Sequence, residues 1–515
     1  MTRSQDEILA ALPPRLIDAP RRWASETPDA PAVFFERSVH SYAGLCRDIG
    51  HAKEHLTRAG IGPGDRVGLV IENCYAAICF FYALSDLEAC AVMANARLSE
   101  REIGVVLSEA DAKAAIFAPS GSAAVDGHAK YADAAPVKDV SFGAVALAIR
   151  DPDAKPETVS EDPAKLLAAM LFTSGTTGVP KGAMLTQRTM LYQAAIVSER
   201  RKFGPGDCPY VVAPMVHVLG LAGMVVPLIH AGAAMEFAAR FDVEAVVEAL
   251  GQGHLTHLYG AAPMFAAIAG YAKKHGGKIK APRIKEILAG GAPADEELRA
   301  TIADIFGMPL GTGYAATECS PISASTPDHP SNPGAVGRPW HGMEMKVVDK
   351  DGNDLPRGEV GEVWCRGPNV MDGYFRKPEA TAEVMRPGGW VAIGDLAYLD
   401  EDGQIHIVGR LKEIINRSGF NVYPAEVEAV LNGYPDVLHS AVVGRKVPDN
   451  EEVIAFVEPV PGHHIDPEAL AAYAAENLAP YKKPARIIIL GALPVGATGK
   501  IAKTVLKDRA EALND

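Results

Sequence analysis

The sequence predicts an α/β protein. It has a large amino-terminal domain, built from doubly wound α/β subdomains and a β-rich subdomain, and a small α+β carboxy-terminal domain. A chain of 515 residues is too long for one hydrophobic core, so at least two domains are expected. Up to about residue 330, helical stretches alternate with short apolar runs, as in sheets covered by helices. Beyond residue 334, short strands are divided by Asp-Gly and Pro-Arg-Gly turns, which indicates β structure.

The elements of the first part follow from its periodicity. Residues 1–118 contain helical stretches such as "AKEHLTRAGI" and strand-like runs such as "DRVGLVIEN" and "AKAAIFAP". Residues 119–165 are rich in Ala, Asp, Pro and Ser with weak periodicity, which predicts variable surface structure. The apolar run "KLLAAMLF" that follows predicts a buried strand or helix, after which the α/β pattern resumes.

Two changes in the sequence pattern mark the predicted domain boundaries. The runs "MEMKVVDKDG", "GEVGEVWCRG" and "GQIHIVGR" predict short strands, so residues 334–410 form the β-rich subdomain of an amino-terminal domain that spans 1–410. Residues 411–515 contain "HSAVVG", "VIAFVEP" and "ARIIIL" with helical stretches between and before them. This pattern fits a small α+β domain.

Composition and charge exclude several classes of protein. Hydrophobic residues make up 48% and charged residues 22% of the chain, as in soluble globular enzymes. The formal net charge of −14 and the lack of a Lys/Arg run argue against nucleic acid as a partner. The seven cysteines form no C-x-x-C pair, so reduced thiols are expected rather than disulfides or a zinc site.

No membrane-spanning or secretory segment is predicted. The amino-terminus carries acidic residues and too short an apolar run for a signal peptide, so a cytoplasmic location is expected. The most hydrophobic stretch, residues 218–235, is slightly shorter than a spanning helix and contains Pro227 and His230. A buried core helix is the better interpretation of that stretch.

The stretch "LFTSGTTGVPKG", residues 171–182, predicts a phosphate-binding loop. Its glycines allow backbone N–H groups to close on an anion, its hydroxyls add donors, and Lys181 adds a positive charge. It is not a Walker loop, because Gly182 rather than Ser or Thr follows the lysine. A metal ligand must therefore come from elsewhere in the chain. A flexible glycine-threonine turn is the weaker alternative.

Four later stretches add candidate residues. "GTGYAATE" places Tyr314, Thr317 and Glu318 after an apparent strand, where a tyrosine can stack on adenine and a carboxylate can supply the oxygen that Mg²⁺ prefers. "GGWVAIGDL", "GRLKE" and "ATGK" contain the other candidates, which are Asp395, Arg410, Lys412 and Lys500. Singly, each of these has an ordinary explanation as a turn carboxylate or a solvated basic residue.

Together and in this order, the stretches resemble the adenylate-forming superfamily of acyl-CoA synthetases, luciferase and peptide-synthetase adenylation domains. The resemblance runs from "SYAGL" to "TGKIAK" and includes "GYAATE", "VGRPWHGMEMKVVD", "GEVGEVWCRGPNVMDGYFRKPEAT", "IGDL" and "GRLKEIINRSGFNVYPAEVE". It implies an acyl-CoA synthetase with ATP, Mg²⁺ and coenzyme A as cofactors or substrates, and a mobile small domain. The carboxylate oxygen attacks the α-phosphorus of ATP to give an acyl-adenylate and pyrophosphate. A thiol then takes the acyl group and releases AMP.

The resemblance also implies the residue roles. Glu318 holds Mg²⁺, Thr317 contacts the α-phosphate, and Lys500 reaches the carboxylate and α-phosphate in the first half-reaction. Lys412 matches the hinge about which the small domain rotates, and Ser418, Gly419 and Phe420 then face the thiol tunnel. The expected ATP-binding residues are Thr173, Ser174, Gly175, Thr176, Thr177, Lys181, Gly291, Ala292, Pro293, Tyr314, Thr317, Asp395, Arg410 and Lys500.

The acid pocket is expected from the same resemblance. Its residues are His217, Val218, Gly260, Gly290, Gly313 and Ala315, with His217 as a gate or a helix cap. No Asp or Glu occurs between Pro214 and Met235, which argues against an amino-acid substrate, because a buried ammonium needs a carboxylate partner. An apolar monocarboxylate, fatty or aromatic, fits best. The alternatives are a luciferase-like enzyme with another acceptor and a non-catalytic nucleotide-binding module. A homodimer is compatible with the sequence.

Departures from the family pattern occur at a few positions. Ala315 stands where glycine is usual, Ile393 lacks the usual hydroxyl, and Phe420 replaces a common glutamate. The segment "VVGRKVPDNEEVIAFV" is shorter than usual and lacks a Gly-Glu pair.

Overall fold

The computed structural model describes residues 3–119, 121–138, 141–173, 180–290, 295–417, 420–448, 450–496 and 501–513. The chain divides into two compact units. The larger comprises Met1–Met345 and Trp364–Ile393, and the smaller comprises Lys346–Val363 and Gly394–Asp515. The chain passes from one unit to the other within the strands β17 (Glu344–Val348), β18 (Gly361–Arg366) and β20 (Trp390–Leu399).

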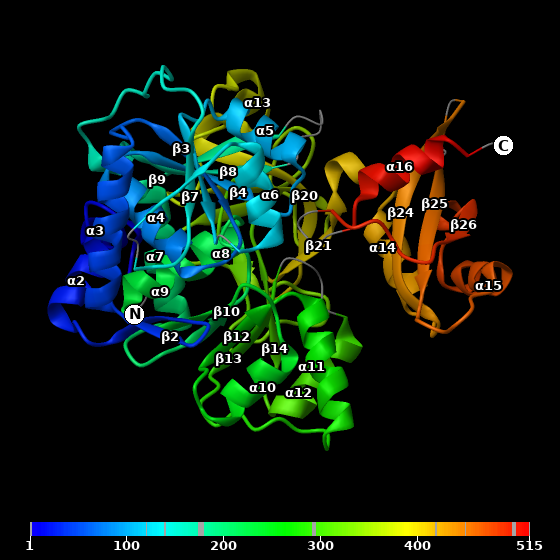
Figure 1. Cartoon of the computed structure of the whole chain (residues 1–515). Helices are drawn as coiled ribbons and strands as arrows, with labels where there is room; N and C mark the ends of the chain where they lie inside the picture. Colours follow the sequence, from blue (N-terminus) through cyan, green and yellow to red (C-terminus); the bar gives the residue numbers. More distant parts are fainter. Residues whose placement is uncertain are drawn as a thin grey trace. The chain divides into compact units, whose positions relative to one another are not determined.

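The first sheet of the larger unit has seven strands in the order β6-β7-β5-β3-β4-β8-β9 (Figure 1). Strands β5, β3, β4 and β8 are parallel to one another, while β7 and β9 are antiparallel to their neighbours. The bounds are β3 Arg66–Ile71, β4 Cys90–Asn95, β5 Ala114–Ala118, β6 Ala135–Pro136, β7 Ala146–Ile149, β8 Leu167–Thr173 and β9 Lys181–Thr186. Every residue of β3, β4 and β5 is buried, as expected for central strands covered on both faces.

The second sheet of the larger unit has nine strands in the order β16-β15-β14-β13-β12-β10-β11-β1-β2. The strands from β14 to β1 are parallel, and β2, β15 and β16 run antiparallel at the two edges. The bounds are β1 Pro31–Phe35, β2 Ser38–Ser41, β10 Pro209–Val211, β11 Met235–Phe237, β12 His257–Gly260, β13 Glu286–Ala289, β14 Leu310–Tyr314, β15 Ser323–Ala324 and β16 Arg338–Pro339.

Helices connect these strands, and several begin at residues that cap them. Ser4, Ser41, Ser99, Thr186, Asp242 and Asp295 each accept a hydrogen bond from a first-turn backbone N–H of the helix that follows. The bounds are α1 Gln5–Ala11, α2 Asp18–Glu26, α3 Tyr42–Arg58, α4 Tyr75–Asp86, α5 Glu100–Glu109, α6 Ala123–Tyr131, α7 Gln187–Arg201, α8 Val218–Gly220, α9 Val226–Ala231, α10 Val243–Gly251, α11 Ala262–Lys274, α12 Glu296–Phe306 and α13 Pro378–Val384. In Figure 1 the helices α10, α11 and α12 lie beside the strands β12, β13 and β14. Short helical turns also occur at Pro163–Lys165, Leu221–Val225 and Pro387–Gly389.

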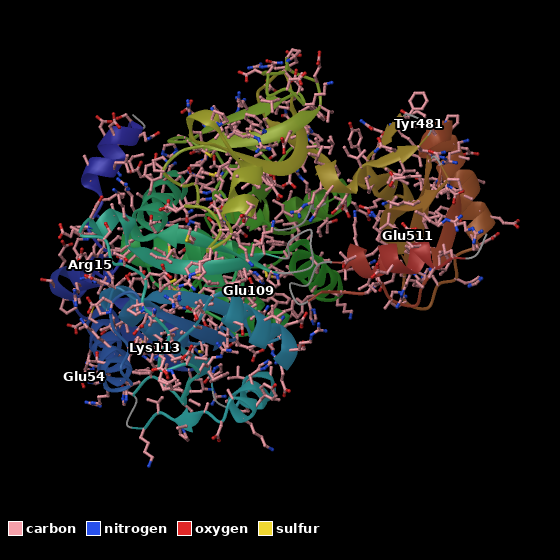
Figure 2. The ribbon with its side chains drawn as sticks, turned by 90° about the horizontal axis from the view of Figure 1, so that it is seen from above. Arg15, Glu54, Glu109, Lys113, Tyr481 and Glu511 are labelled. Atoms are coloured by element: carbon pink, nitrogen blue, oxygen red, sulfur yellow. The ribbon has the colours of Figure 1, made fainter. Side chains whose placement is uncertain are left out.

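The core of the larger unit is organised around α4 and α7. All twelve residues of α4 are buried, and α7 is buried from Gln187 to Ser198 except at Arg188, which is exposed. At the amino-terminal end of the seven-stranded sheet, the Lys113 ammonium bonds the Asp65 carboxylate at 2.9 Å and the Gly60 carbonyl at 2.8 Å; Lys113 is labelled in Figure 2. Burial of apolar side chains on both faces of both sheets is the main stabilising term.

The smaller unit contains strands of its own around two hydrophobic clusters. A three-stranded sheet has the order β24-β25-β26, and β22 pairs with β23. The β-rich stretch before it forms a five-stranded sheet in the order β17-β18-β20-β19, with β21 on β20, and β19 of this sheet belongs to the larger unit. The bounds are β17 Glu344–Val348, β19 Met385–Arg386, β21 Ile405–Arg410, β22 Ile415–Arg417, β23 Phe420–Val422, α14 Pro424–Asn432, β24 Val437–Val447, β25 Asn450–Pro459, α15 Pro467–Asn477, β26 Arg486–Ile489 and α16 Lys503–Glu511; the short turns are Leu411–Glu413 and Pro480–Lys482.

The fold class agrees with the sequence expectation, while two stretches differ from what was expected of them. Residues 119–165 contain the helix α6 and the strands β6 and β7, and β7 pairs with β5, so part of this stretch belongs to the sheet. The apolar stretch 218–235 is helical only as far as Ala231, because Gly232 adopts a left-handed φ of 74° that ends the helix. A side chain there would also meet the Trp23 ring, at 2.4 Å from an added Cβ. Among the described residues, no helix is both long and apolar enough to cross a membrane.

Candidate active site

The predicted phosphate-binding loop joins two antiparallel strands. β8 ends at Thr173 and β9 begins at Lys181, and these two residues are paired across the strands. The stem of the loop is therefore fixed by the sheet. Lys181 is largely buried, with its side chain 15% exposed, and its ammonium lies 5.4 Å from the centre of the Tyr374 ring. It also lies 3.9 Å from the exposed carboxylate of Glu383.

Three predicted acid-pocket glycines lie together at the carboxyl ends of neighbouring parallel strands. Gly260 at the end of β12 pairs with Ala289 of β13, and Ala289 pairs with Thr312 of β14. The Gly290 N–H donates to the Gly260 carbonyl at 2.9 Å. Gly313 follows Thr312 directly, so the three glycines share one edge of the sheet, where ligands bind in open α/β sheets.

His217 precedes a helix with an irregular first part. It is half-buried and occupies the amino-terminal cap position of α8, and the helix then passes through a π-helical turn at Leu221–Val225 before α9. π-turns inside helices are frequent at functional sites. Leu219 lies against Gly290, since a Cβ added to that glycine would stand 3.6 Å from the Leu219 Cδ2. The helix start therefore supplies an apolar wall next to the strand ends.

Glu318 lies on a tight turn after β14. Ala316 and Cys319 exchange backbone hydrogen bonds across it, at 3.0 and 3.2 Å. The half-buried carboxylate of Glu318 accepts a 2.7 Å hydrogen bond from the hydroxyl of Tyr374, and its carbonyl accepts one from the Met371 N–H at 2.9 Å. Thr317 is next to it and half-buried. A carboxylate with one oxygen held by a phenol is a fitting ligand for a hard divalent cation.

The segment that leads to His217 is held by a buried asparagine that the sequence analysis did not single out. Asn73, 5% exposed, follows β3. Its amide nitrogen donates to the carbonyls of Ala213 and Ala238 at 3.1 Å, and its amide oxygen accepts from the Met215 N–H at 2.8 Å. Asn73 thus joins the end of one sheet to the connection that follows β10 in the other.

Replacing Asn73 by alanine is expected to lower the free energy of unfolding by about 2–4 kcal/mol, because buried backbone donors and acceptors lose their partners. The Michaelis constant for the acid is also expected to rise, since the segment before His217 loses its anchor. Urea unfolding of the variant measures the first effect. Asn353→Ala, at an exposed turn, is the matched control and should cost less than about 1 kcal/mol. Equal stability losses for the two variants would contradict the anchoring role.

In the smaller unit, two of the residues expected to bind ATP are neighbours. Asp395 of β20 and Arg410 of β21 are paired across the strands, and the Arg410 Nε lies 3.1 Å from the Asp395 carboxylate. Asp395 is buried, while the Arg410 side chain is 52% exposed. Fifteen residues apart in the chain, they form one polar pair.

Lys412, the predicted hinge, is exposed in the short helical turn Leu411–Glu413. The next residue is held firmly: the Lys503 ammonium lies 3.0 Å from the Glu413 carboxylate and 2.9 Å from that of Glu428. Burial alone would lower the pKa of Lys503, but the two carboxylates outweigh it and raise the pKa above its ordinary value. Glu413 is therefore tied to the start of α16, close in sequence to Lys500.

Phe420, the described residue of the predicted thiol-facing turn, is 55% exposed. Its ring stacks on that of Tyr481, with centroids 4.7 Å apart and planes inclined by 22°. Tyr481 is labelled in Figure 2. Arg417 donates to the Lys483 carbonyl at 2.5 Å.

Ten of the predicted site residues lie outside the described residues. They are Ser174, Gly175, Thr176, Thr177, Gly291, Ala292, Pro293, Ser418, Gly419 and Lys500. Of the others, Thr173 and Lys181 come together at the loop stem, the acid-pocket glycines share one strand edge, and Asp395 pairs with Arg410.

Comparisons with known proteins decide the family. The family described as AMP-binding enzyme matches residues 20–375, and the AMP-binding enzyme C-terminal domain matches residues 426–500. The chain is 33% identical to a feruloyl-CoA synthase from Amycolatopsis over 95% of this chain and 98% of that protein. It is 30% identical to a 4-coumarate–CoA ligase from Oryza sativa subsp. japonica over 95% of this chain and 91% of that protein.

The chain belongs to the adenylate-forming acyl-CoA ligases. The crystal structure of ATP-bound MatB from Rhodopseudomonas palustris is similar over 96% of this chain and 99% of that one, with a TM-score of 0.82 and 27% identity. The protein is thus an AMP-forming carboxylate–CoA ligase, whose substrates include ATP and coenzyme A. The comparisons do not favour a luciferase-like enzyme or a non-catalytic nucleotide-binding module.

Two residues of the ligase were given no role by the sequence analysis. Tyr374 lies in the stretch "GYFRKPEAT", and its contact with Glu318 joins residues 56 positions apart. Asn73 lies in "IENCY", which has no distinctive pattern. A tyrosine in a family stretch was a usable signal for the first, whereas only the tertiary structure shows the second.

Proposed function

We propose that this ligase activates an apolar aryl monocarboxylic acid and transfers it to coenzyme A. The observation that carries the proposal is the lack of charge around the strand edge. Among the described residues at the ends of β12, β13 and β14, and from Val218 to Val225, none is Lys, Arg, Asp or Glu. A second carboxylate or an ammonium on the substrate would need a charged partner there.

An aromatic acid is favoured by the relatives. The two curated relatives described above are named for feruloyl-CoA and 4-coumarate, both aryl acids. The Leu219 side chain beside Gly290 offers an apolar wall, with its Cδ2 at 3.6 Å from a Cβ added to that glycine. His217 at the start of the helix is proposed as the gate of this pocket, with Val218, Gly260, Gly313 and Ala315 as further lining residues.

In the first half-reaction, the carboxylate attacks the α-phosphorus of ATP and pyrophosphate leaves. Both reactants are anions, so the site must supply positive charge. We assign the β- and γ-phosphates to the loop from Thr173 to Lys181 and the α-phosphate to Thr317. Tyr314 is assigned to adenine, opposite the backbone of residues 290–293, and the Asp395–Arg410 pair to ribose. Lys500 is assigned to the carboxylate and the α-phosphate.

The proposed Mg²⁺ ligand is Glu318. The half-buried carboxylate with one oxygen bonded by Tyr374 fits a hard cation, and no hydroxyl follows Lys181 in the loop. When bound, the metal offsets the negative charge of the phosphates. The residues of the chain orient the ATP and exclude water around it.

Glu318→Gln is expected to lower turnover at limiting Mg²⁺ by about tenfold or more, because the neutral amide is a poor ligand for Mg²⁺. A Mg²⁺ titration of pyrophosphate exchange measures the effect. Glu383→Gln, at an exposed carboxylate nearby, is the control and should leave the titration midpoint in place. If Glu318→Gln and the wild type had the same midpoint in the Mg²⁺ titration, the assignment of Glu318 as the Mg²⁺ ligand would be wrong.

For the second half-reaction we propose that the chain rotates at Lys412, so the functional boundary lies between residues 410 and 411. Lys412 is exposed, whereas Glu413 is tied to Lys503. A rotation at Lys412 would move residues 413–515 as one body and exchange Lys500 for the turn Ser418–Phe420. The acyl carbon is then attacked by the thiol of coenzyme A, and AMP leaves.

A panel of acids tests the proposed substrate class. Ferulate, 4-coumarate, benzoate, a medium-chain fatty acid, malonate and an amino acid are each assayed for AMP release that depends on coenzyme A. The proposal expects the aryl monocarboxylates to give the highest kcat/KM and the dicarboxylate and amino acid to be poor substrates. Preference for malonate or for the amino acid would contradict it.

We propose a cytoplasmic enzyme, since ATP and coenzyme A are available there and the cysteines are free. A homodimer is the proposed assembly. Cell fractionation and sedimentation analysis test these two statements.

A further inference from the structure

Residues 370–375 connect the end of the phosphate loop to the Glu318 turn. On one side, the Phe375 N–H donates to the Gly182 carbonyl and the Met184 N–H donates to the Gly373 carbonyl, both at 2.9 Å. On the other side, the Met371 N–H donates to the Glu318 carbonyl at 2.9 Å, and Val370 pairs with Cys319. The segment is thus bonded to β9 and to the Glu318 turn at once.

The side chain of Tyr374 also joins the end of the phosphate loop to the Glu318 turn. The residue is 7% exposed, its hydroxyl donates to the Glu318 Oε1 at 2.7 Å, and its ring lies 5.4 Å from the Lys181 ammonium. Its backbone N–H donates to the Thr381 hydroxyl at 2.9 Å, which fixes the start of the side chain. One aromatic ring therefore contacts both the loop lysine and the metal-binding candidate.

The hydroxyl of Tyr374 is the donor in its contact with Glu318, because an ionised carboxylate oxygen only accepts hydrogen bonds. The phenol donates to one carboxylate oxygen and leaves the other oxygen directed elsewhere. The geometry thus selects one orientation of the Glu318 carboxylate.

We propose that Tyr374 is a positioning residue, whose hydroxyl holds the Glu318 carboxylate in the orientation that receives a divalent cation beside the phosphate loop. The proposal rests on the proposed role of Glu318 as the Mg²⁺ ligand. It adds a residue that touches neither the substrate nor the metal, and it gives a physical link between Lys181 and Glu318. Hydrogen bonds from a second layer commonly set the affinity of a metal site in this way.

The test uses Tyr374→Phe, which keeps the ring and removes the hydroxyl. Mg²⁺ is titrated into the full-length enzyme with α,β-methylene-ATP, a non-reacting analogue, and binding is followed by isothermal calorimetry. The same titration is made on Glu318→Gln, on the double variant and on Tyr42→Phe. Tyr42 is the matched control, because it is a buried tyrosine whose hydroxyl donates to a backbone carbonyl, that of Ala233, at 2.8 Å.

The expected result is an increase of about tenfold in the Mg²⁺ midpoint for Tyr374→Phe, with no further increase when it is added to Glu318→Gln. Tyr42→Phe should keep the wild-type midpoint. An unchanged Mg²⁺ midpoint in Tyr374→Phe overturns the proposal. The proposal is also overturned if Tyr374→Phe raises the midpoint by the same factor in the wild type and in Glu318→Gln. If Glu318→Gln itself leaves the midpoint unchanged, the proposed metal role of Glu318 fails, and the proposal for Tyr374 fails with it.

A second measurement covers the case in which Tyr374→Phe does not fold. 3-Fluorotyrosine placed at position 374 keeps the hydroxyl and reports through its fluorine resonance. The resonance is expected to move when Mg²⁺ is added to the complex with the ATP analogue, and to stay in place in the Glu318→Gln background. A fluorine resonance that does not move when Mg²⁺ is added in the wild-type background overturns the proposal.

Discussion

Lys500→Ala is expected to lower acyl-adenylate formation by ~10²–10³, the usual loss when one group that stabilises a charged transition state is removed. Thioester formation from a supplied acyl-adenylate should stay within a few-fold of the wild type. The physical reason is that the lysine charge is needed while the carboxylate attacks the α-phosphorus, and not while the thiol attacks the acyl carbon. The two half-reactions are measured separately, by pyrophosphate exchange and by acyl-CoA formation.

The control for this variant is Lys507→Ala, which removes an exposed lysine from α16. It should leave both half-reactions at the wild-type rate. Equal losses of the two half-reactions in Lys500→Ala would show that the assignment of Lys500 to adenylation is wrong.

Lys412→Pro is expected to lower thioester formation by orders of magnitude while adenylation survives. A hinge residue must change its φ and ψ between two states, and proline fixes φ near −65° and restricts the residue before it. The variant should therefore hold one domain orientation. Adenylation is expected to persist because, in the proposed order of steps, ATP binds and reacts before the rotation.

Lys412→Ala is the matched control, since it removes the charge and keeps the backbone free. It should support both half-reactions. Parallel loss of both in Lys412→Pro, with intact Lys412→Ala, would point to misfolding or a misplaced hinge. Unchanged thioester formation in the proline variant would rule out rotation at this residue.

The sequence predicted the parts of the fold that local patterns encode. The fully buried strands β3 and β5 correspond to the apolar runs "DRVGLVIEN" and "AKAAIFAP", and the ambiguous run "KLLAAMLF" is the strand β8. The stretch 119–165 was harder to predict, because β7 is a short strand that lies antiparallel between β6 and β5, and its weak pattern resembles a loop.

Candidate residues of the site could be named from the sequence where they stand in family stretches. Contacts that depend on how elements pack together could not be predicted. Asp395 and Arg410 were both identified from their stretches, and the structure adds that a strand pairing brings them together. The hydrogen bond from Tyr374 to Glu318 and the contacts of Asn73 join residues that are far apart in the chain. The periodicity of apolar residues along the chain does not predict such contacts, since they depend on how two elements pack.

This ligase forms an acyl-adenylate by attack of the substrate carboxylate on the α-phosphorus of ATP. The most direct test supplies an acid accepted by the enzyme with a heavy oxygen isotope in its carboxylate, together with ATP and coenzyme A, and analyses the products by mass spectrometry. Attack on the α-phosphorus leaves one labelled oxygen in AMP, one in the thioester and none in pyrophosphate. Unlabelled AMP, or ADP with the label in inorganic phosphate, would contradict it.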